Sequence, residues 1–167
     1  MDNVNIFNQS DMQRLYRYGC TLCMDQDDAY DLLQYAFEKY LKSRTKRKYG
    51  SDMAYVRSIM RNRFIDEYRR SKRFPEESYD EQSPVAMNES SLEDIVIAQS
   101  DLEIIWEKLD PFEREILYYW AIEEMTTKEI SLQINVPKGT ILSRIFRVRK
   151  KITEEFGSGQ LSRGYQP

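Results

Sequence analysis

The chain has 167 residues, which is enough for one ordinary domain or two small ones. Six glycines, five prolines and a hydrophobic fraction of 41% are typical of a soluble helical protein, and no segment is long and apolar enough to span a membrane. The formal net charge of −3 does not exclude a nucleic-acid partner, because phosphate binding depends on the local field within a Debye length.

Positive and negative charges are separated into blocks along the chain. Residues 42–73 carry twelve Lys or Arg against three acids, a net of +9, whereas residues 76–110 carry eleven acids against one Lys, a net of −10. Residues 138–151 add six Lys or Arg and no acid. The pattern predicts two basic surfaces with an acidic segment between them.

Composition gives little support to metal or enzyme chemistry. Cys20 and Cys23 form a CxxC pair, but the chain has no His and no second Cys pair, so it cannot supply four Cys or His ligands to zinc. Spacing by three on an apolar helix face favours two small core residues. Without a His as general base and without a glycine-rich phosphate loop, we expect no enzyme, no catalytic residue, no metal and no cofactor.

The first two predicted helices form a pair. Ser10 and Gln13 predict a capping box that opens a helix ending near Met24. Asp27 or Asp28 is expected to cap the next helix. The inward positions are predicted to be Met12, Leu15 and Leu22 in the first helix, and Ala29, Leu32, Leu33, Ala36, Phe37, Tyr40 and Leu41 in the second. The outer face of the second helix mixes acids with exposed rings, which suits a protein partner. This face carries Tyr30, Asp31, Gln34, Tyr35 and Glu38.

A basic loop and a third helix follow. Residues 44–51 read RTKRKYGS, with Gly50 for the turn, and Asp52 is expected to cap a helix. Its inward positions are predicted to be Val56, Ile59, Met60 and Phe64. Basic residues here alternate with Tyr49, Tyr55, Phe64 and Tyr68. Cations interleaved with rings suit opened DNA, because phosphates need charge and unstacked bases need a flat surface. Each ring taken singly fits a core position better.

An acidic linker divides the chain. The segment from Phe74 to about Ser90 has two prolines, many acids and few branched apolar residues. Helix is predicted again over 92–109. Asp110, Pro111 and Glu113 then provide an N-cap, an N1 proline and a capping-box acid for the next helix. The chain after Phe156 is expected to be unstructured.

Residues 125–156 predict a helix-turn-helix. Thr126 and Glu129 form a capping box, Asn135 tolerates the left-handed turn, and Pro137 presets the start of a second helix. That helix places Ile141, Ile145, Val148, Ile152 and Phe156 inward, and Ser143, Arg144, Arg147 and Lys151 on much of the remaining surface. A basic second helix of this kind is suited to the major groove of DNA. The alternative is a helical hairpin with a solvated cationic face.

Three motifs in this order resemble the extracytoplasmic-function sigma factors, the two-domain relatives of sigma-70. DAYDLLQYAF (28–37) is similar to the helix that binds core RNA polymerase in that family. RSIMRNRFIDEYRR (57–70) is similar to the −10-element helix. LDPFEREIL (109–117), followed by residues 125–151, is similar to the −35-binding domain.

The resemblance implies an all-α fold with two small helical domains joined by a flexible acidic linker. Residues 1–74 would form a sigma-2-like domain that binds core polymerase and the −10 element. Residues 75–91 would be the linker, residues 92–156 a sigma-4-like helix-turn-helix domain that binds the −35 element, and residues 157–167 a tail.

Site residues follow from the same resemblance. The −35 element would be read by Lys138, Thr140, Ser143, Arg144, Phe146 and Arg147. The −10 strand would be bound by Lys46, Arg47, Lys48, Arg61, Asn62, Asp66, Arg69 and Arg70, with Asn62 and the basic loop holding a flipped base. Core polymerase would be bound by Asp28, Tyr30, Asp31, Gln34, Tyr35 and Phe37.

The expected function is that of a sigma factor, a non-enzymatic subunit that directs core polymerase to promoters and helps to melt them. Tyr30 and Tyr35 stand where the family commonly has Glu, and Leu142 where Lys or Arg is common. The two tyrosines lead us to expect that core binding is conditional on a partner, or on a phosphate that a kinase adds at a hydroxyl such as Ser43 or Thr45, to supply the missing negative charge. Leu142 implies a different DNA affinity or sequence preference at that position. An anti-sigma factor that holds the protein inactive is a further expected partner. The alternative is a free-standing helix-turn-helix regulator of duplex DNA. The N-terminus lacks a basic-then-apolar signal segment, which predicts a cytoplasmic, bacterial protein.

Overall fold

The computed structural model describes residues 6–43, 51–72 and 99–160, and within them it is helical and has no strand. The chain divides into two compact units, Met1–Ser78 and Tyr79–Pro167. The prediction of an all-α fold with two helical domains is confirmed. The predicted linker, the basic loop at 44–50 and the chain after Gln160 lie outside the described residues.

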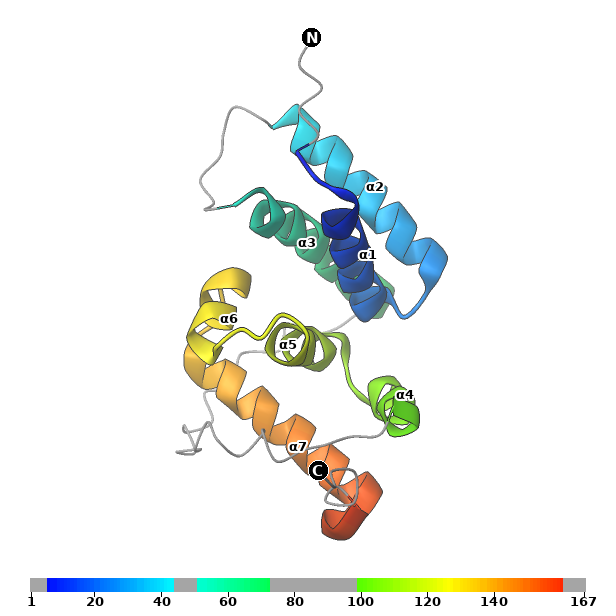
Figure 1. Cartoon of the computed structure of the whole chain (residues 1–167), viewed down its shortest axis with the longest axis vertical. Helices are drawn as coiled ribbons and strands as arrows, with labels where there is room; N and C mark the ends of the chain where they lie inside the picture. The colour runs from blue at the N-terminus through cyan, green and yellow to red at the C-terminus, as the bar shows by residue number, and fades with distance from the viewer. Residues whose placement is uncertain (1–5, 44–50, 73–98, 161–167) are drawn as a thin grey trace. The chain divides into compact units, whose positions relative to one another are not determined.

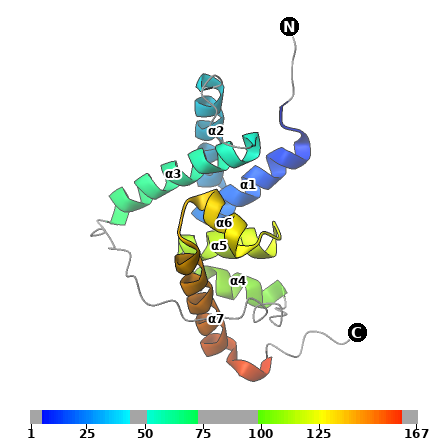
Figure 2. The ribbon, with the colours of Figure 1, turned by 90° about the vertical axis from the view of Figure 1, so that its left-hand side faces the viewer.

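The first unit is a three-helix bundle of α1 (Gln9–Cys23), α2 (Gln26–Lys42) and α3 (Asp52–Lys72). All three pack against one another, and Figure 2 shows α1 and α3 lying against α2. Gly19 permits the close approach, since a Cβ atom there would lie 3.3 Å from the Cβ of Ala29 and 3.2 Å from Cε of Met60. The core consists of Leu15, Tyr18, Leu22, Ala29, Leu32, Leu33, Ala36, Tyr40, Val56 and Met60.

Three helix starts in this unit differ from the prediction. The α1 capping box is formed by Asn8 and Asp11 rather than by Ser10 and Gln13. Asp25 caps α2. Ser51 Oγ accepts from the backbone N–H of Ala54 at the start of α3. Each true cap lies one to three residues before the predicted one, because several residues in each stretch have side chains that can cap a helix.

Two apolar residues predicted to face inward are exposed instead. They are Met12 on α1 and Leu41 on α2. The bundle covers about one face of each helix, so residues at the margin of an apolar stripe stay in water. The predicted end of α1 is confirmed, since Met24 is its left-handed C-cap.

The second unit contains α4 (Gln99–Lys108), α5 (Pro111–Ala121), α6 (Thr127–Ile134) and α7 (Lys138–Gln160) (Figure 1). Ile105, Leu109, Val148 and Ile152 form one buried cluster, against which Trp106 and Leu117 pack. Helix α7 continues to Gln160, four residues beyond the end predicted at Phe156. In the part of the chain that the structure describes, no helix has the length and apolarity needed to cross a bilayer.

Candidate nucleic-acid and partner interfaces

Helix α6 begins with the capping box that the sequence predicts. Thr126 Oγ1 accepts from the backbone N–H of Glu129, and Glu129 Oε2 accepts from both the backbone N–H (2.7 Å) and the hydroxyl (2.9 Å) of Thr126. These hydrogen bonds stabilise the ionised carboxylate of Glu129 and so lower its pKa. The bond from the backbone N–H of Thr126 has the largest effect. The start of α6 is therefore set by its own first turn.

The turn between α6 and α7 depends on Asn135, which is left-handed (φ 54°, ψ 48°) as predicted. Ser131 Oγ donates to the carbonyl of Val136 at 2.6 Å, which ties the turn to the preceding helix. Helix α7 starts one residue after Pro137, whose carbonyl accepts from the backbone N–H of Thr140 and of Ile141. The two helices thus have the connection of a helix-turn-helix.

Helix α7 has a buried stripe and an exposed basic face. Ile141, Ile145, Val148 and Ile152 are buried as predicted, while the side chain of Phe156 is outside the described set. Of the predicted −35 residues, Lys138, Phe146 and Arg147 are exposed, and Thr140 and Ser143 are half-buried. Ser143 Oγ donates to the carbonyl of Gly139 at 3.0 Å. Most of the predicted reading residues therefore reach solvent.

Arg144 lies apart from the other predicted −35 residues. Its side chain is 18% exposed, one guanidinium nitrogen is 3.7 Å from Oδ2 of Asp110, and the guanidinium lies over the ring of Phe112, 5.3 Å from the ring centroid. Helix α5 therefore holds this cation. Lys150, by contrast, was not among the predicted reading residues but is exposed one turn after Arg147. The basic run of residues 138–151, which includes Lys150, was the sequence feature that could have identified it.

The predicted −10 residues lie on α3 and in the loop before it. Asn62, Asp66, Arg69 and Arg70 are exposed, and Arg61 is half-buried. Asn62, Asp66 and Arg69 are spaced by four and three residues, so they share one face of the helix. Lys46, Arg47 and Lys48 lie outside the described residues.

The aromatic residues interleaved with these cations serve two different purposes. The hydroxyl of Tyr55 is 2.7 Å from Ser43 Oγ, and its ring lies beside Tyr40, so this residue joins α3 to α2. Ser43 Oγ also donates to the carbonyl of Lys39 at 2.8 Å, so a phosphate at this position would replace contacts that close α2. Phe64 and Tyr68 instead stack on each other at the surface of a groove, with ring centroids 5.7 Å apart.

The predicted polymerase-binding residues of α2 are unequally exposed. Asp28, Tyr30, Asp31 and Gln34 are exposed, whereas Tyr35 and Phe37 are half-buried. Phe37 meets the ring of Phe7 edge-on at 5.4 Å. The rings of Tyr30 and of Tyr16 on α1 make a T-shaped contact, with their centroids 5.5 Å apart, although 59% of Tyr30 remains exposed.

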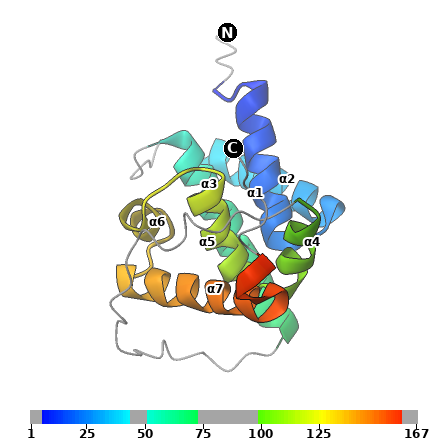
Figure 3. The same cartoon turned by 60° about the horizontal axis from the view of Figure 1, so that its bottom comes forward.

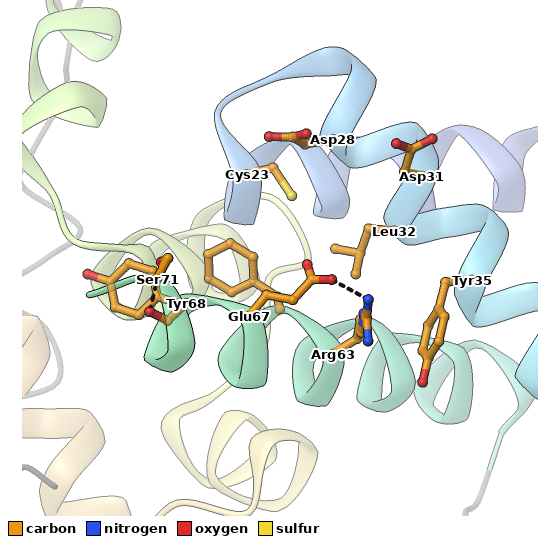
Figure 4. A pocket seen from close by; sticks show the side chains of 10 residues that line it. Cys23, Asp28, Asp31, Leu32, Tyr35, Arg63, Glu67, Tyr68 and Ser71 are labelled. Atoms are coloured by element: carbon orange, nitrogen blue, oxygen red, sulfur yellow. Dashed lines mark hydrogen bonds and ion pairs between the residues drawn. The ribbon is translucent and has the colours of Figure 1, made fainter. Parts of the chain in front are cut away.

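A groove of about 450 Å³ with both polar and apolar lining runs between α2 and α3. Figure 4 shows Asp28 and Asp31 on the α2 side, facing Arg63, Glu67, Tyr68 and Ser71 on α3. Arg63 pairs with Glu67 at 2.5 Å and lies over the ring of Tyr35. The groove therefore combines acidic side chains, one held cation and an aromatic wall, which is a surface suited to a protein partner.

Cys23 is among the residues that line this groove, and both Cys20 and Cys23 are free and half-buried. Burial, and secondarily the negative charge of Asp28, raises the pKa of the Cys23 thiol to about 12. The thiol is therefore protonated at neutral pH and a poor nucleophile. This environment fits the expected structural role.

Comparison with protein families places two models on the chain. The model of sigma-70 region 2 matches residues 9–74, which include α1 to α3. The model of sigma-70, region 4, matches residues 105–152, which include the helix-turn-helix. The two matches occur in the order in which the sequence motifs resemble the family.

Individual proteins are also similar to the chain. The ECF RNA polymerase sigma factor SigE of Mycolicibacterium smegmatis is 28% identical over 145 residues, which cover 84% of this chain and 56% of that protein. The chain thus spans little more than half the length of this curated relative. The sigma factor RpoE of Bartonella quintana, solved in complex with the anti-sigma factor NepR, has a similar fold, with a TM-score of 0.63 at 19% identity over 90% of this chain and 94% of that one.

Proposed function

The chain belongs to the sigma-70 family, in its extracytoplasmic-function group, and on that premise we propose that it is an RNA polymerase sigma factor. It would direct core polymerase to particular promoters and start transcription by −35 recognition and −10 melting. It would act in the bacterial cytoplasm as a regulator without catalytic residues. Its partners would be core polymerase and promoter DNA.

The observation that carries this proposal is the presence of two different polar helix surfaces, one on each unit. Helix α7 exposes Lys138, Phe146 and Arg147 behind a well-formed turn, which suits the major groove. Helix α3 exposes Asn62, Asp66 and Arg69 on one face, which suits an opened strand with a displaced base. A regulator that binds only duplex DNA would need the first surface but not the second.

For the upstream contact, we propose that the exposed residues of α7 bind the −35 element, and that the half-buried Thr140 and Ser143 lie at the edge of this contact surface. For the downstream contact, we assign the flipped −10 base to Asn62 and the phosphates beside it to the arginines of α3, together with Lys46, Arg47 and Lys48. Extruding a base costs a few kcal/mol, so phosphate contacts next to the pocket are needed to offset it.

Core polymerase would dock on α2 through Asp28, Asp31 and Gln34, which are exposed. Phe37, whose ring makes a T-shaped contact with that of Phe7, would support that surface. Tyr30 and Tyr35 reduce the negative charge of this surface. We propose that docking depends on a further signal. An anti-sigma factor that holds the protein inactive is one controlling partner, since the similar sigma factor RpoE was solved with one. A kinase that adds a phosphate near the end of α2 is another.

Reconstitution with core polymerase of the native host tests the function. The expected result is a specific transcript and permanganate-reactive thymines near −10 on templates selected from genomic DNA. A protein that protects duplex DNA alone, with no transcript and no reactive thymine in the presence of core polymerase, would instead be a free-standing regulator. Native mass spectrometry of the protein purified from its host would identify the controlling partner.

A further inference from the structure

The N-terminus of α5 carries two acids that complete its capping box. Asp110 Oδ1 accepts from the backbone N–H groups of Phe112 and Glu113, each at 2.9 Å. Glu113 Oε2 accepts in return from the backbone N–H of Asp110 at 3.0 Å. The positive end of the α5 dipole favours both carboxylates here. Glu113 is nevertheless only 2% exposed, so its charge requires a further partner.

Two cations of α7 reach these acids. Lys151 Nζ donates to Glu113 Oε2 at 2.6 Å, and Arg144 lies 3.7 Å from Oδ2 of Asp110 with its guanidinium on the Phe112 ring. Arg144 and Lys151 are seven residues apart, which is about two helical turns, so they lie on one flank of α7. On the same flank, Glu155 pairs with Lys108 of α4. Figure 3 shows α5 lying against α7, with α4 near the C-terminal part of α7.

The burial of Glu113 separates its pair with Lys151 from ordinary surface ion pairs, although 41% of the Lys151 side chain is exposed. Removing Lys151 would leave the Glu113 carboxylate buried without its cation, which is strongly destabilising. The neighbouring Lys150 is 3.8 Å from Glu154, and both side chains are about two-thirds exposed, so this pair contributes little. Two adjacent lysines of the basic run therefore have different environments and, by this argument, different functions.

We infer that the capping box of α5 sets the rotation of α7 about its own axis, with Arg144 and Lys151 as positioning residues. The face turned toward duplex DNA is then the one that carries Ser143, Phe146, Arg147 and Lys150. Lys150 contacts a phosphate, and Arg144 reads no base. The part of this inference that concerns DNA rests on the proposed function.

The adjacent lysines provide a matched test, because Lys150→Gln and Lys151→Gln make the same change of charge. Binding of the full chain in complex with core polymerase is measured at several salt concentrations. The probes are a duplex selected by the wild-type complex from a randomised pool and a scrambled duplex of equal composition. Lys150→Gln should reduce the slope of log K against log salt by about 0.9, with the ratio of the two affinities unchanged. Lys151→Gln should leave the slope unchanged and reduce the ratio roughly tenfold, as expected for one displaced base contact.

Rescue and coupling distinguish positioning from a general loss of fold. Lys151→Arg should restore the ratio. In urea unfolding of the full chain, Glu113→Gln and Lys151→Gln should be non-additive, because they remove the same contact and Gln preserves the capping box. If Lys151→Gln prevents folding, Arg144→Gln replaces it in the binding measurement. In unfolding, Arg144→Gln is then combined with Asp110→Asn, because Arg144 pairs with Asp110 and Asn preserves the helix cap. Additive effects in unfolding, or slopes that fall equally for Lys150→Gln and Lys151→Gln, would overturn the inference.

The two experiments distinguish failure of the proposed function from failure of this inference. A wild-type chain that binds no duplex in complex with core polymerase would refute that function. The unfolding cycle contains no DNA and would still decide whether α5 anchors α7.

Discussion

The guanidinium of Arg63 lies over the ring of Tyr35, 4.7 Å from the ring centroid, and pairs on α3 with Glu67. Lys39 lies 5.6 Å from the same ring. Tyr35 thus faces two cations through its negative π-surface, although the family resemblance leads one to expect a glutamate at this position. Tyr30, the other tyrosine in place of an acid, instead makes a T-shaped contact with the ring of Tyr16.

We predict that Tyr30→Glu raises the affinity for core polymerase about twofold to fivefold, because an exposed charge contributes up to roughly 1 kcal/mol. Tyr35→Glu should raise it less, since Arg63 and Lys39 would neutralise the new carboxylate. Competition binding against a labelled sigma factor measures both. Tyr30→Gln is the control for shape without charge. Equal gains for the two Glu variants would show that Tyr35 and Arg63 are not coupled.

Asn62 and Arg147 should affect different steps of initiation. Asn62→Ala should reduce the permanganate reactivity near −10 roughly tenfold, as expected for lost hydrogen bonds to a held base, and leave binding to the −35 duplex intact. Arg147→Ala should weaken the −35 duplex by a similar factor without changing the melting of a complex already formed. Asn62→Gln and Arg147→Lys are the matched controls. Similar losses in both assays for both variants would contradict the assignment of two sites.

Thr126→Ala should lower the free energy of unfolding of the second unit by about 1 kcal/mol, because it removes the α6 cap. Trp106 and Trp120 are the only tryptophans of the chain and both lie in the second unit, so their fluorescence during urea unfolding reports on it specifically. Glu129→Gln preserves the capping box and serves as the control.

The effect of Thr126→Ala should also depend on pH. The pKa of Glu129 is lowered below its ordinary value of 4.5 by hydrogen bonds from Thr126. Their contribution is therefore present above pH 4.5 and is lost as the pH falls through the lowered pKa. Thr126→Ala removes the hydroxyl bond to Glu129 Oε2 and keeps the backbone bond, so the part of its effect that comes from the hydroxyl bond should disappear in acid. A difference between wild type and Thr126→Ala that stays constant down to pH values where the carboxyl is protonated would show that the Thr126 hydroxyl does not stabilise the ionised Glu129.

Cys23 should be alkylated slowly in the folded protein. Its pKa of about 12, against an ordinary value of 9.0, makes the reactive thiolate roughly a thousandfold rarer at pH 8 than in the unfolded chain. Iodoacetamide labelling with peptide mapping measures the rate at Cys23 separately from that at Cys20. Because the unfolded chain releases this proton first, stability should also decline as the pH rises from 9 toward 12. Equal labelling rates in buffer and in urea would contradict the raised pKa.

Local interactions made much of this protein readable from its sequence. The capping boxes at Asp110 and Thr126, the left-handed Asn135 and the apolar stripe of α7 involve residues within about one turn or a few turns of one another. Their spacing therefore identified the helix-turn-helix. The first helix start was misplaced because Asn8 and Ser10 begin overlapping capping patterns, and nothing within the segment decides between them.

Tertiary packing alone decided what individual cations and rings do. Arg144, Arg147, Lys150 and Lys151 look alike in the sequence, yet Arg144 and Lys151 turn to α5 while Arg147 and Lys150 remain exposed. Lys151 pairs with Glu113, which is 38 positions earlier in the chain. A helical pattern tells which side of a helix is apolar, but the flank that meets another helix depends on how the two pack. The ionic partner of a flanking cation therefore emerges only in the folded unit.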